Sequence, residues 1–140
     1  SGPTVSEMYL IKAETSARLG NITEAMEAVN KLRANRMKPG AWVDLAATNK
    51  DEAIKLVLDE RRRELPFAQR WFDIKRFNNN DYALDDVELE RTFYPYTNTN
   101  VLVDQALKKY ILPKNSRRYA APIPQTEIIA SNGKLIQNNY

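Results

Sequence analysis

Apolar residues recur at helical spacing in the first third of the chain and predict two helices. Thr4 and Glu7 form a capping box, so the first helix should begin there and run to about Leu19. Gly20 supplies a left-handed cap, and Asn21 can open the second helix. The expected apolar faces are Val5, Met8, Tyr9, Ala13 and Ala17 on the first helix and Ala25, Val29 and Leu32 on the second. A turn this short makes the two helices antiparallel.

A third helix is predicted after a loop at residues 38–48. Thr48 with Asp51 should open it, and Pro66 must end or kink it because proline lacks the backbone donor. The expected apolar positions of this helix are Ala53, Ile54, Val57, Leu58 and Leu65. A short amphipathic segment follows at residues 70–77.

Residues 78–140 are rich in Asn, Pro and Tyr and have only short apolar runs, which predicts loops. A brief hairpin is expected near residues 89–94 and 110–112, and a late helical turn at 125–130. The predicted fold class is mainly α, with a tetratricopeptide-like helical hairpin, further helices, and a loop-rich C-terminal part with little β. Only one such repeat is evident, and a single repeat cannot bury its own apolar faces.

Composition excludes several classes of function. The chain of 140 residues has no cysteine and no histidine, which excludes disulfides, thiolate nucleophiles, imidazole bases and zinc sites built on these residues. Its 21 basic and 18 acidic residues give a net charge of +3, too small and too interspersed to indicate nucleic-acid binding. No apolar run is long enough to predict a membrane span.

The densest charged cluster lies between residues 59 and 76 and contains arginines, carboxylates and a tryptophan. Such arginines can hold an anionic or sugar ligand, or they can lock two helices together through paired hydrogen bonds. Glu60 and Glu64 share one helical face, as the acid and base carboxylates of a glycosidase could. Glu60 with Arg63 and Glu64 with Arg61 also have the spacing of ordinary ion pairs. We favour the structural network, because such pairs are more often structural than catalytic.

Two further segments have compositions that are seen in binding sites. The aromatic and amide-rich loop at residues 94–100 could stack and hydrogen-bond a sugar, although Asn, Pro and Thr are also the usual residues of surface turns. An acidic patch comprises Asp81, Asp85, Asp86 and Glu88. It lacks the glycine and terminal glutamate of a calcium loop, so solvated surface is the expected state.

Four segments occur in an order that resembles the C-terminal part of the SusD/RagB family. They are residues 9–14 (YLIKAE) with 17–20 (ARLG), 60–65 (ERRREL), 70–76 (RWFDIKR), and 122–128 (PIPQTEI) with the closing Gln137, Asn138 and Tyr140. One departure lies at residues 66–69 (PFAQ), where the family usually has a Glu-Gly pair. The resemblance covers nearly the whole chain.

The resemblance implies an outer-membrane, surface-facing lipoprotein that binds glycans or other nutrients and passes them to a TonB-dependent, SusC-like transporter. It implies a binding protein with no catalysis, no cofactor, no metal and no nucleic-acid partner. Members of the family are longer, so the chain would be a soluble C-terminal fragment of a SusD-like α-helical domain. Its parts would be the helix pair at 4–37, the helix and Arg-Trp motif at 48–77, and the loop-rich region at 78–140. The family's lipid-bearing cysteine has no counterpart here.

Ligand contacts in the family come mostly from segments upstream of these motifs, so the resemblance assigns no ligand-binding residue to this chain. It instead implies a partly buried ion and stacking network that fixes the third helix against its neighbours. The expected members are Glu60, Arg61, Arg62, Glu64, Arg70, Trp71 and Asp73. We predict that Arg70→Ala or Asp73→Ala strongly lowers thermal stability. The alternative functions are a tetratricopeptide-type adaptor that binds a partner peptide and a glycosidase that uses Glu60 and Glu64.

Overall fold

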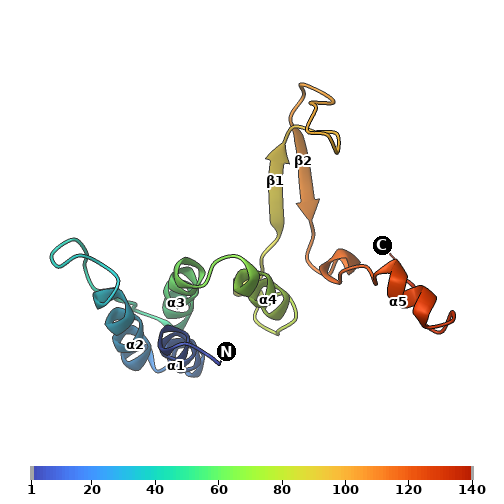
Figure 1. Cartoon of the computed structure of the whole chain (residues 1–140). Coiled ribbons are helices and arrows are strands. Elements are labelled where there is room, and N and C mark those ends of the chain that lie inside the picture. Colours follow the sequence, from blue (N-terminus) through green and yellow to red (C-terminus); the bar gives the residue numbers. More distant parts are fainter. Residues whose placement is uncertain (1, 140) are drawn as a thin grey trace. The chain divides into compact units, whose positions relative to one another are not determined.

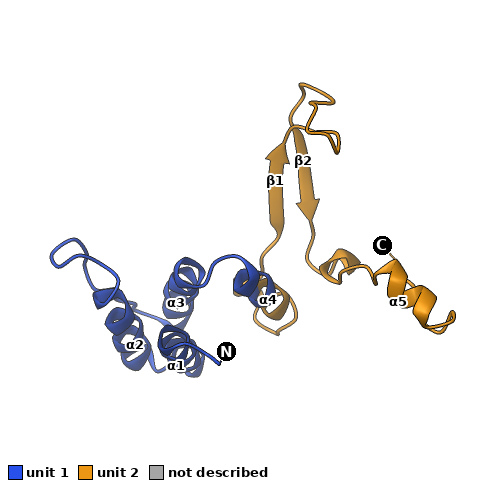
Figure 2. Cartoon of the chain, in the orientation of Figure 1, with its two compact units in different colours: residues 1–73 blue, residues 74–140 orange. Residues whose placement is uncertain are grey.

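The computed structural model describes residues 2–139 and is mainly helical, with a single two-stranded sheet among those residues (Figure 1). This confirms the predicted fold class. The chain divides into two compact units, residues 1–73 and residues 74–140 (Figure 2). Unit 1 contains three complete helices, and unit 2 contains the sheet, short helices and loops.

Helix α1 (Val5–Leu19) is bounded by the predicted caps. The Thr4 hydroxyl accepts a hydrogen bond from the backbone N–H of Glu7 at 3.2 Å, which satisfies one orphan donor of the first turn. Gly20 has φ 85°, a left-handed conformation that favours glycine. Its N–H donates to the Ala17 carbonyl, and the N–H of the next residue donates to the Ser16 carbonyl, which together form a Schellman motif.

Helix α2 (Ile22–Ala34) packs against α1 through small side chains. Ala13, Ala17 and Ala25 are fully buried, so the two backbones can approach closely. The predicted apolar face of α1 is wrong at its start, because Val5 is 75% and Met8 is 53% exposed. Leu10 provides the large buried side chain of this helix instead.

Helix α3 (Lys50–Glu64) contacts both α1 and α2, and its predicted positions Ala53, Ile54 and Val57 are buried. Its cap is Asn49 and not the predicted Thr48, because the Asn49 side chain accepts the hydrogen bond from the N–H of Glu52 at 2.9 Å. Asn21 likewise precedes α2 without making a side-chain cap. Helix α3 ends before Pro66, as predicted, and helix α4 follows at Ala68–Phe77.

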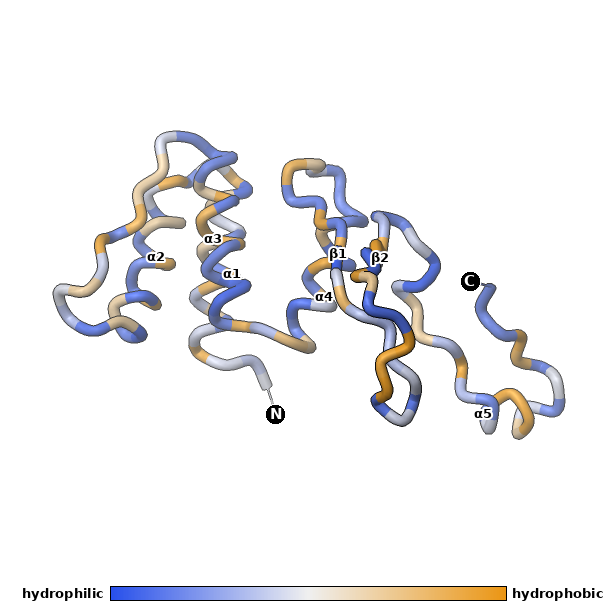
Figure 3. Tube along the Cα trace, turned by 90° about the horizontal axis from the view of Figure 1, so that it is seen from above, coloured by the Kyte–Doolittle hydropathy of each residue, from blue (hydrophilic) through white to orange (hydrophobic). Residues whose placement is uncertain are grey.

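Unit 2 contains the predicted hairpin, whose strands β1 (Leu89–Phe93) and β2 (Lys108–Leu112) pair antiparallel. The predicted late helical turn is helix α5 (Gln125–Ala130). Two 3-10 turns, Ala83–Asp85 and Arg117–Tyr119, flank the hairpin. Hydrophobic stretches in this unit are short and interrupted by hydrophilic ones (Figure 3), which leaves little material for a core of its own.

Three amide side chains hold extended segments by bonding both the N–H and the C=O of one residue. The pairs are Asn30 with Leu45 (2.8 and 2.9 Å), Asn78 with Val87 (2.7 and 2.9 Å) and Gln137 with Ile123 (2.9 and 2.9 Å). An amide can satisfy both groups at once because it carries a donor and an acceptor. We call these contacts the amide clamps; each ties a loop residue to its own unit.

Candidate functional site

The predicted charged cluster centres on Glu60, a buried residue of α3. One of its carboxylate oxygens accepts hydrogen bonds from Arg33 of α2 and from Arg63 of its own helix, each at 2.8 Å. Arg33 is as deeply buried as Glu60, whereas Arg63 is exposed. The Arg33–Glu60 pair therefore joins α2 to α3 through charges that are withdrawn from water.

Two further ion pairs extend the network. Arg61 donates from Nε to Asp73 of α4 at 2.8 Å, and both side chains are less than a tenth exposed. Arg36, just past α2, donates three hydrogen bonds to the two carboxylate oxygens of Glu64, the shortest 2.7 Å. Arg61 thus does not pair with Glu64 as its sequence spacing suggested.

Arg33 and Arg36 were missed in the sequence because they lie 27 and 28 residues before their partners. Only the packing of α2 beside α3 brings these side chains together, and no spacing rule reports such a contact. The composition of residues 59–64 gives no signal for them either, because its three acids and three arginines are balanced without outside partners.

The other predicted members of the network lie at its edge. Arg70 and Trp71 on α4 are partly exposed, and Arg62 is exposed on α3. Burial is the main cause that lowers the pKa of the Arg70 guanidinium, and the positive charge of Arg62 adds to it. Asp73 and Asp59 act in the opposite direction. The structure thus brings Glu60, Arg61, Glu64 and Asp73 into direct ion pairs and leaves Arg62 toward solvent.

The carboxylates of this cluster are engaged by arginines, which bears on the glycosidase alternative. Arg36 holds the pKa of Glu64 below its ordinary value, mainly by hydrogen bonding. A general acid needs a raised pKa, so Glu64 is poorly suited to protonate a leaving group. Within residues 2–139, no group of three or more carboxylates is placed to hold a metal ion.

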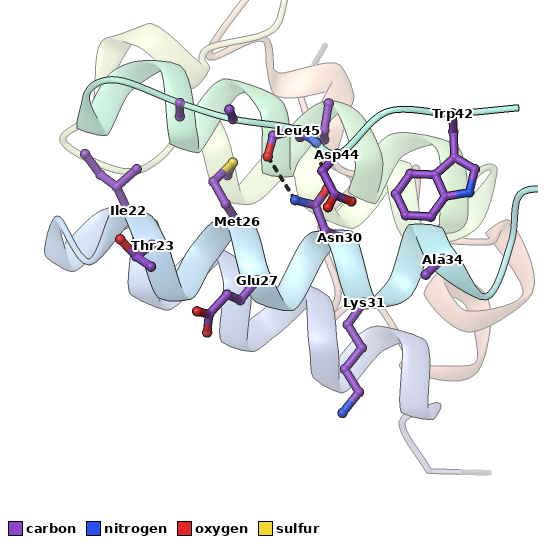
Figure 4. A pocket seen from close by; sticks show the side chains of 12 residues that line it. Ile22, Thr23, Met26, Glu27, Asn30, Lys31, Ala34, Trp42, Asp44 and Leu45 are labelled. Carbon is purple, nitrogen blue, oxygen red and sulfur yellow. Dashed lines mark hydrogen bonds between the residues drawn. The ribbon is translucent and has the colours of Figure 1, made fainter. Parts of the chain in front are cut away.

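A groove of about 580 Å³ runs between α2 and the extended segment at 42–47 (Figure 4). Met26 and Asn30 of α2 face this segment, and Trp42 stands at one end. The Asn30 amide is already used by the clamp on Leu45, and Lys31 points away, with its ammonium 5.3 Å from the ring centre of Tyr9. The groove therefore offers an indole and apolar side chains, with the acidic residues Glu27 and Asp44 also in its lining.

The remaining sequence candidates lie in unit 2. The loop at 94–100 is an exposed turn that Thr97 organises by accepting from Val101 N–H and donating its own N–H to the Val101 carbonyl. The acidic patch was expected to be solvated surface, and this expectation is wrong for Asp85. Asp85 is buried and accepts two hydrogen bonds from Asn80, at 3.1 and 3.0 Å. The hydrogen bonds from the Asn80 amide offset the cost of removing this carboxylate from water.

Comparison with known proteins identifies the family. The sequence matches the model of the SusD family over residues 5–140. A SusD-like protein of Formosa agariphila is 42% identical over 79 residues, which cover 52% of this chain and 16% of the relative. No solved structure matches the chain significantly. The chain belongs to the SusD family, and the segment aligned with that relative spans about a sixth of the relative's length.

Proposed function

We propose that the chain is the C-terminal part of a cell-surface protein that binds glycans or other nutrients and delivers them to a TonB-dependent, SusC-like transporter. The observation that carries this proposal is the family match over residues 5–140. The order of the motifs, with the Arg-Trp segment after the arginine-rich helix, supports the same assignment.

The geometry supports a scaffolding role for unit 1 within such a protein. Buried ion pairs connect α2 to α3 and α3 to α4, and an exposed pair joins Arg36 to Glu64. Buried ion pairs fix relative helix positions because their geometry must be satisfied. We propose that residues 4–37, 48–77 and 78–140 are the structural parts of one C-terminal region, and that the protein is not an enzyme.

Attachment to the outer membrane is part of the same proposal. Among the described residues, every helix is too short or too polar to cross a bilayer. A lipid anchor elsewhere in the full-length protein would supply the attachment, because a lipid chain with a second membrane signal holds a protein stably.

Binding and delivery can be tested on the full-length protein. We expect titration calorimetry with a panel of oligosaccharides to show binding, and an affinity tag on this protein to recover a TonB-dependent transporter from solubilised outer membranes. Absence of both results for a folded protein would contradict the proposal. A protein tagged at the same position but lacking residues 78–140 tests whether this region matters for recovery.

The α1–α2 helical hairpin is also compatible with an alternative function, a tetratricopeptide-type adaptor that binds a partner peptide. Such an adaptor needs several stacked repeats, so the coding sequence upstream should show further copies and no export signal. An upstream export signal followed by a lipidated cysteine would favour the transport role instead.

A further inference from the structure

The hairpin of unit 2 carries an arrangement that the proposed scaffolding role does not use. The register places Leu89 opposite Leu112, Arg91 opposite Tyr110, and Phe93 opposite Lys108. Side chains alternate between the two faces of a sheet, so these six residues share one face. Glu90, Thr92, Lys109 and Ile111 occupy the other face.

The shared face carries an aromatic pair. The rings of Phe93 and Tyr110 stack with centroids 4.4 Å apart and planes 15° apart. Both residues remain over two-fifths exposed, so the stack is open to a ligand. A hollow of about 380 Å³ lies beside it, and its lining includes Leu89, Leu112 and Tyr110. That volume is within the range of small-molecule sites.

Arginine dominates the polar lining of this hollow. Arg91 of β1 and Arg118 of the following 3-10 turn line it, and among residues 2–139 neither guanidinium has an ion-pair partner. The one acidic lining residue is Glu90, whose carboxylate pairs with Lys109 at 2.7 Å. The uncompensated charge at the hollow is therefore positive.

We infer that this hollow binds an anionic sugar, with a pyranose ring on Tyr110 and a carboxylate or sulfate on Arg91 and Arg118. An aromatic face suits the apolar face of a pyranose, and a guanidinium fork matches a planar or tetrahedral anion. This inference rests on the proposed nutrient-binding function and adds a substrate class, acidic glycans, and a place for them. An acidic peptide would satisfy the arginines but would leave the exposed stack without a ring to match it.

The test uses trigalacturonic acid and its fully methyl-esterified, uncharged form as probes for titration calorimetry with the 140-residue chain. The acid should bind, and the ester should bind at least tenfold more weakly. Arg118→Gln and Tyr110→Leu should each weaken binding of the acid roughly tenfold, since each removes a charged hydrogen bond or a stacking surface. Arg117→Gln removes the same charge from the same 3-10 turn, at an exposed residue that does not line the hollow, and should change the affinity less than twofold.

Several results would overturn the inference. Equal binding of acid and ester, equal effects of Arg118→Gln and Arg117→Gln, tighter binding of hexaglutamate than of the sugar acid, or no binding of the acid at all would each do so. Hydrogen exchange of the β1 and β2 amides, compared with that of the parent, checks that each variant keeps the hairpin. If the full-length protein binds neutral oligosaccharides and Arg118→Gln does not matter, the inference fails while the proposed function stands. If the chain binds the acid at this hollow but no transporter is recovered, the delivery role fails alone.

Discussion

The buried pair of Arg61 and Asp73 joins α3 to α4, so removing either charge should lower the stability of the protein. Both side chains are nearly inaccessible, and their contact is 2.8 Å long. We predict that Arg61→Ala or Asp73→Ala lowers the free energy of unfolding by about 3–5 kcal/mol, because each removes one member of a buried ion pair and leaves the other charge in place. Urea denaturation followed by circular dichroism measures the loss.

A matched control lies on the same helix. Lys55 and Asp59 pair at 2.8 Å on an exposed part of α3, so Lys55→Ala should cost less than about 1 kcal/mol. The double variant Arg61→Met with Asp73→Leu should lose less than the sum of the two alanine variants, since it removes both charges of the pair together. Unchanged stability in both alanine variants would show that the pair does not hold α3 and α4 together.

Glu64 makes stability depend on pH. Its folded pKa is depressed, mainly by the hydrogen bonds from Arg36, so its contribution is fully present above the unfolded pKa of about 4.3. As the pH falls through the lower folded value, Glu64 takes up a proton and that contribution is lost. Thermal melts from pH 7 to pH 3 should therefore show Glu64→Gln below the parent at neutral pH and converging with it in acid. A constant gap across this range would contradict the assignment.

At the residue scale, the sequence predicted the residue types of the network but only one of its four ion pairs, Glu60 with Arg63. The excess of arginines and carboxylates at 59–76 marks the network, but Glu60 and Glu64 take Arg33 and Arg36 as partners. Ion-pair choice depends on which helices pack together, and several arginines on α3 were equally placed by spacing alone. Asp85 was expected in water because no spacing rule for irregular segments reports the hydrogen bonds that it accepts from Asn80 in a buried position.

The amide clamps explain how long segments without regular structure keep their place. Asn30 satisfies both backbone groups of Leu45 and so fixes the extended segment beside α2 (Figure 4). We predict that Asn30→Asp frees this segment, because a carboxylate can accept from the Leu45 N–H but cannot donate to its carbonyl. The expected loss is about 1 kcal/mol, because the Leu45 carbonyl loses its donor at a site that is only partly buried.

Hydrogen exchange can localise this effect. The Leu45 amide should exchange faster in Asn30→Asp, while the amides of Ala53 and Val57 in α3 should keep their protection. These core positions act as an internal control for global unfolding. Equal acceleration at Leu45 and in α3 would mean that the clamp acts on the whole unit and not on its segment.

The elements themselves were largely predictable. Helical spacing, the Gly20 cap, Pro66 and the short apolar runs gave α1, α2, α3, the hairpin and α5 because each depends on nearby residues. The caps of α2 and α3 were assigned less well, since Thr48 and Asn49 are both good capping residues and backbone conformation decides between them. The clamps have no local signal, because each joins residues that are 9 to 15 positions apart.

The two units differ in how many hydrophobic side chains they bury. Nearly all buried hydrophobic residues of the described chain belong to residues 1–73, and only Ile74 and Phe77 lie beyond them. The hairpin has no buried residue in either strand. A two-stranded hairpin of this kind is marginally stable in water, because its backbone hydrogen bonds are exposed and few apolar contacts support them.

We therefore predict that the two units open independently. In the isolated chain, backbone amides of β1 and β2 should exchange at least a hundredfold faster than those of α1 and α3, because opening the hairpin exposes little apolar surface. Mass spectrometry of exchanged and digested protein measures both groups in one sample. Protection of the hairpin equal to that of α1 would show that another surface covers it. Dilution separates the causes, since cover by a second copy weakens as concentration falls whereas packing within one chain does not.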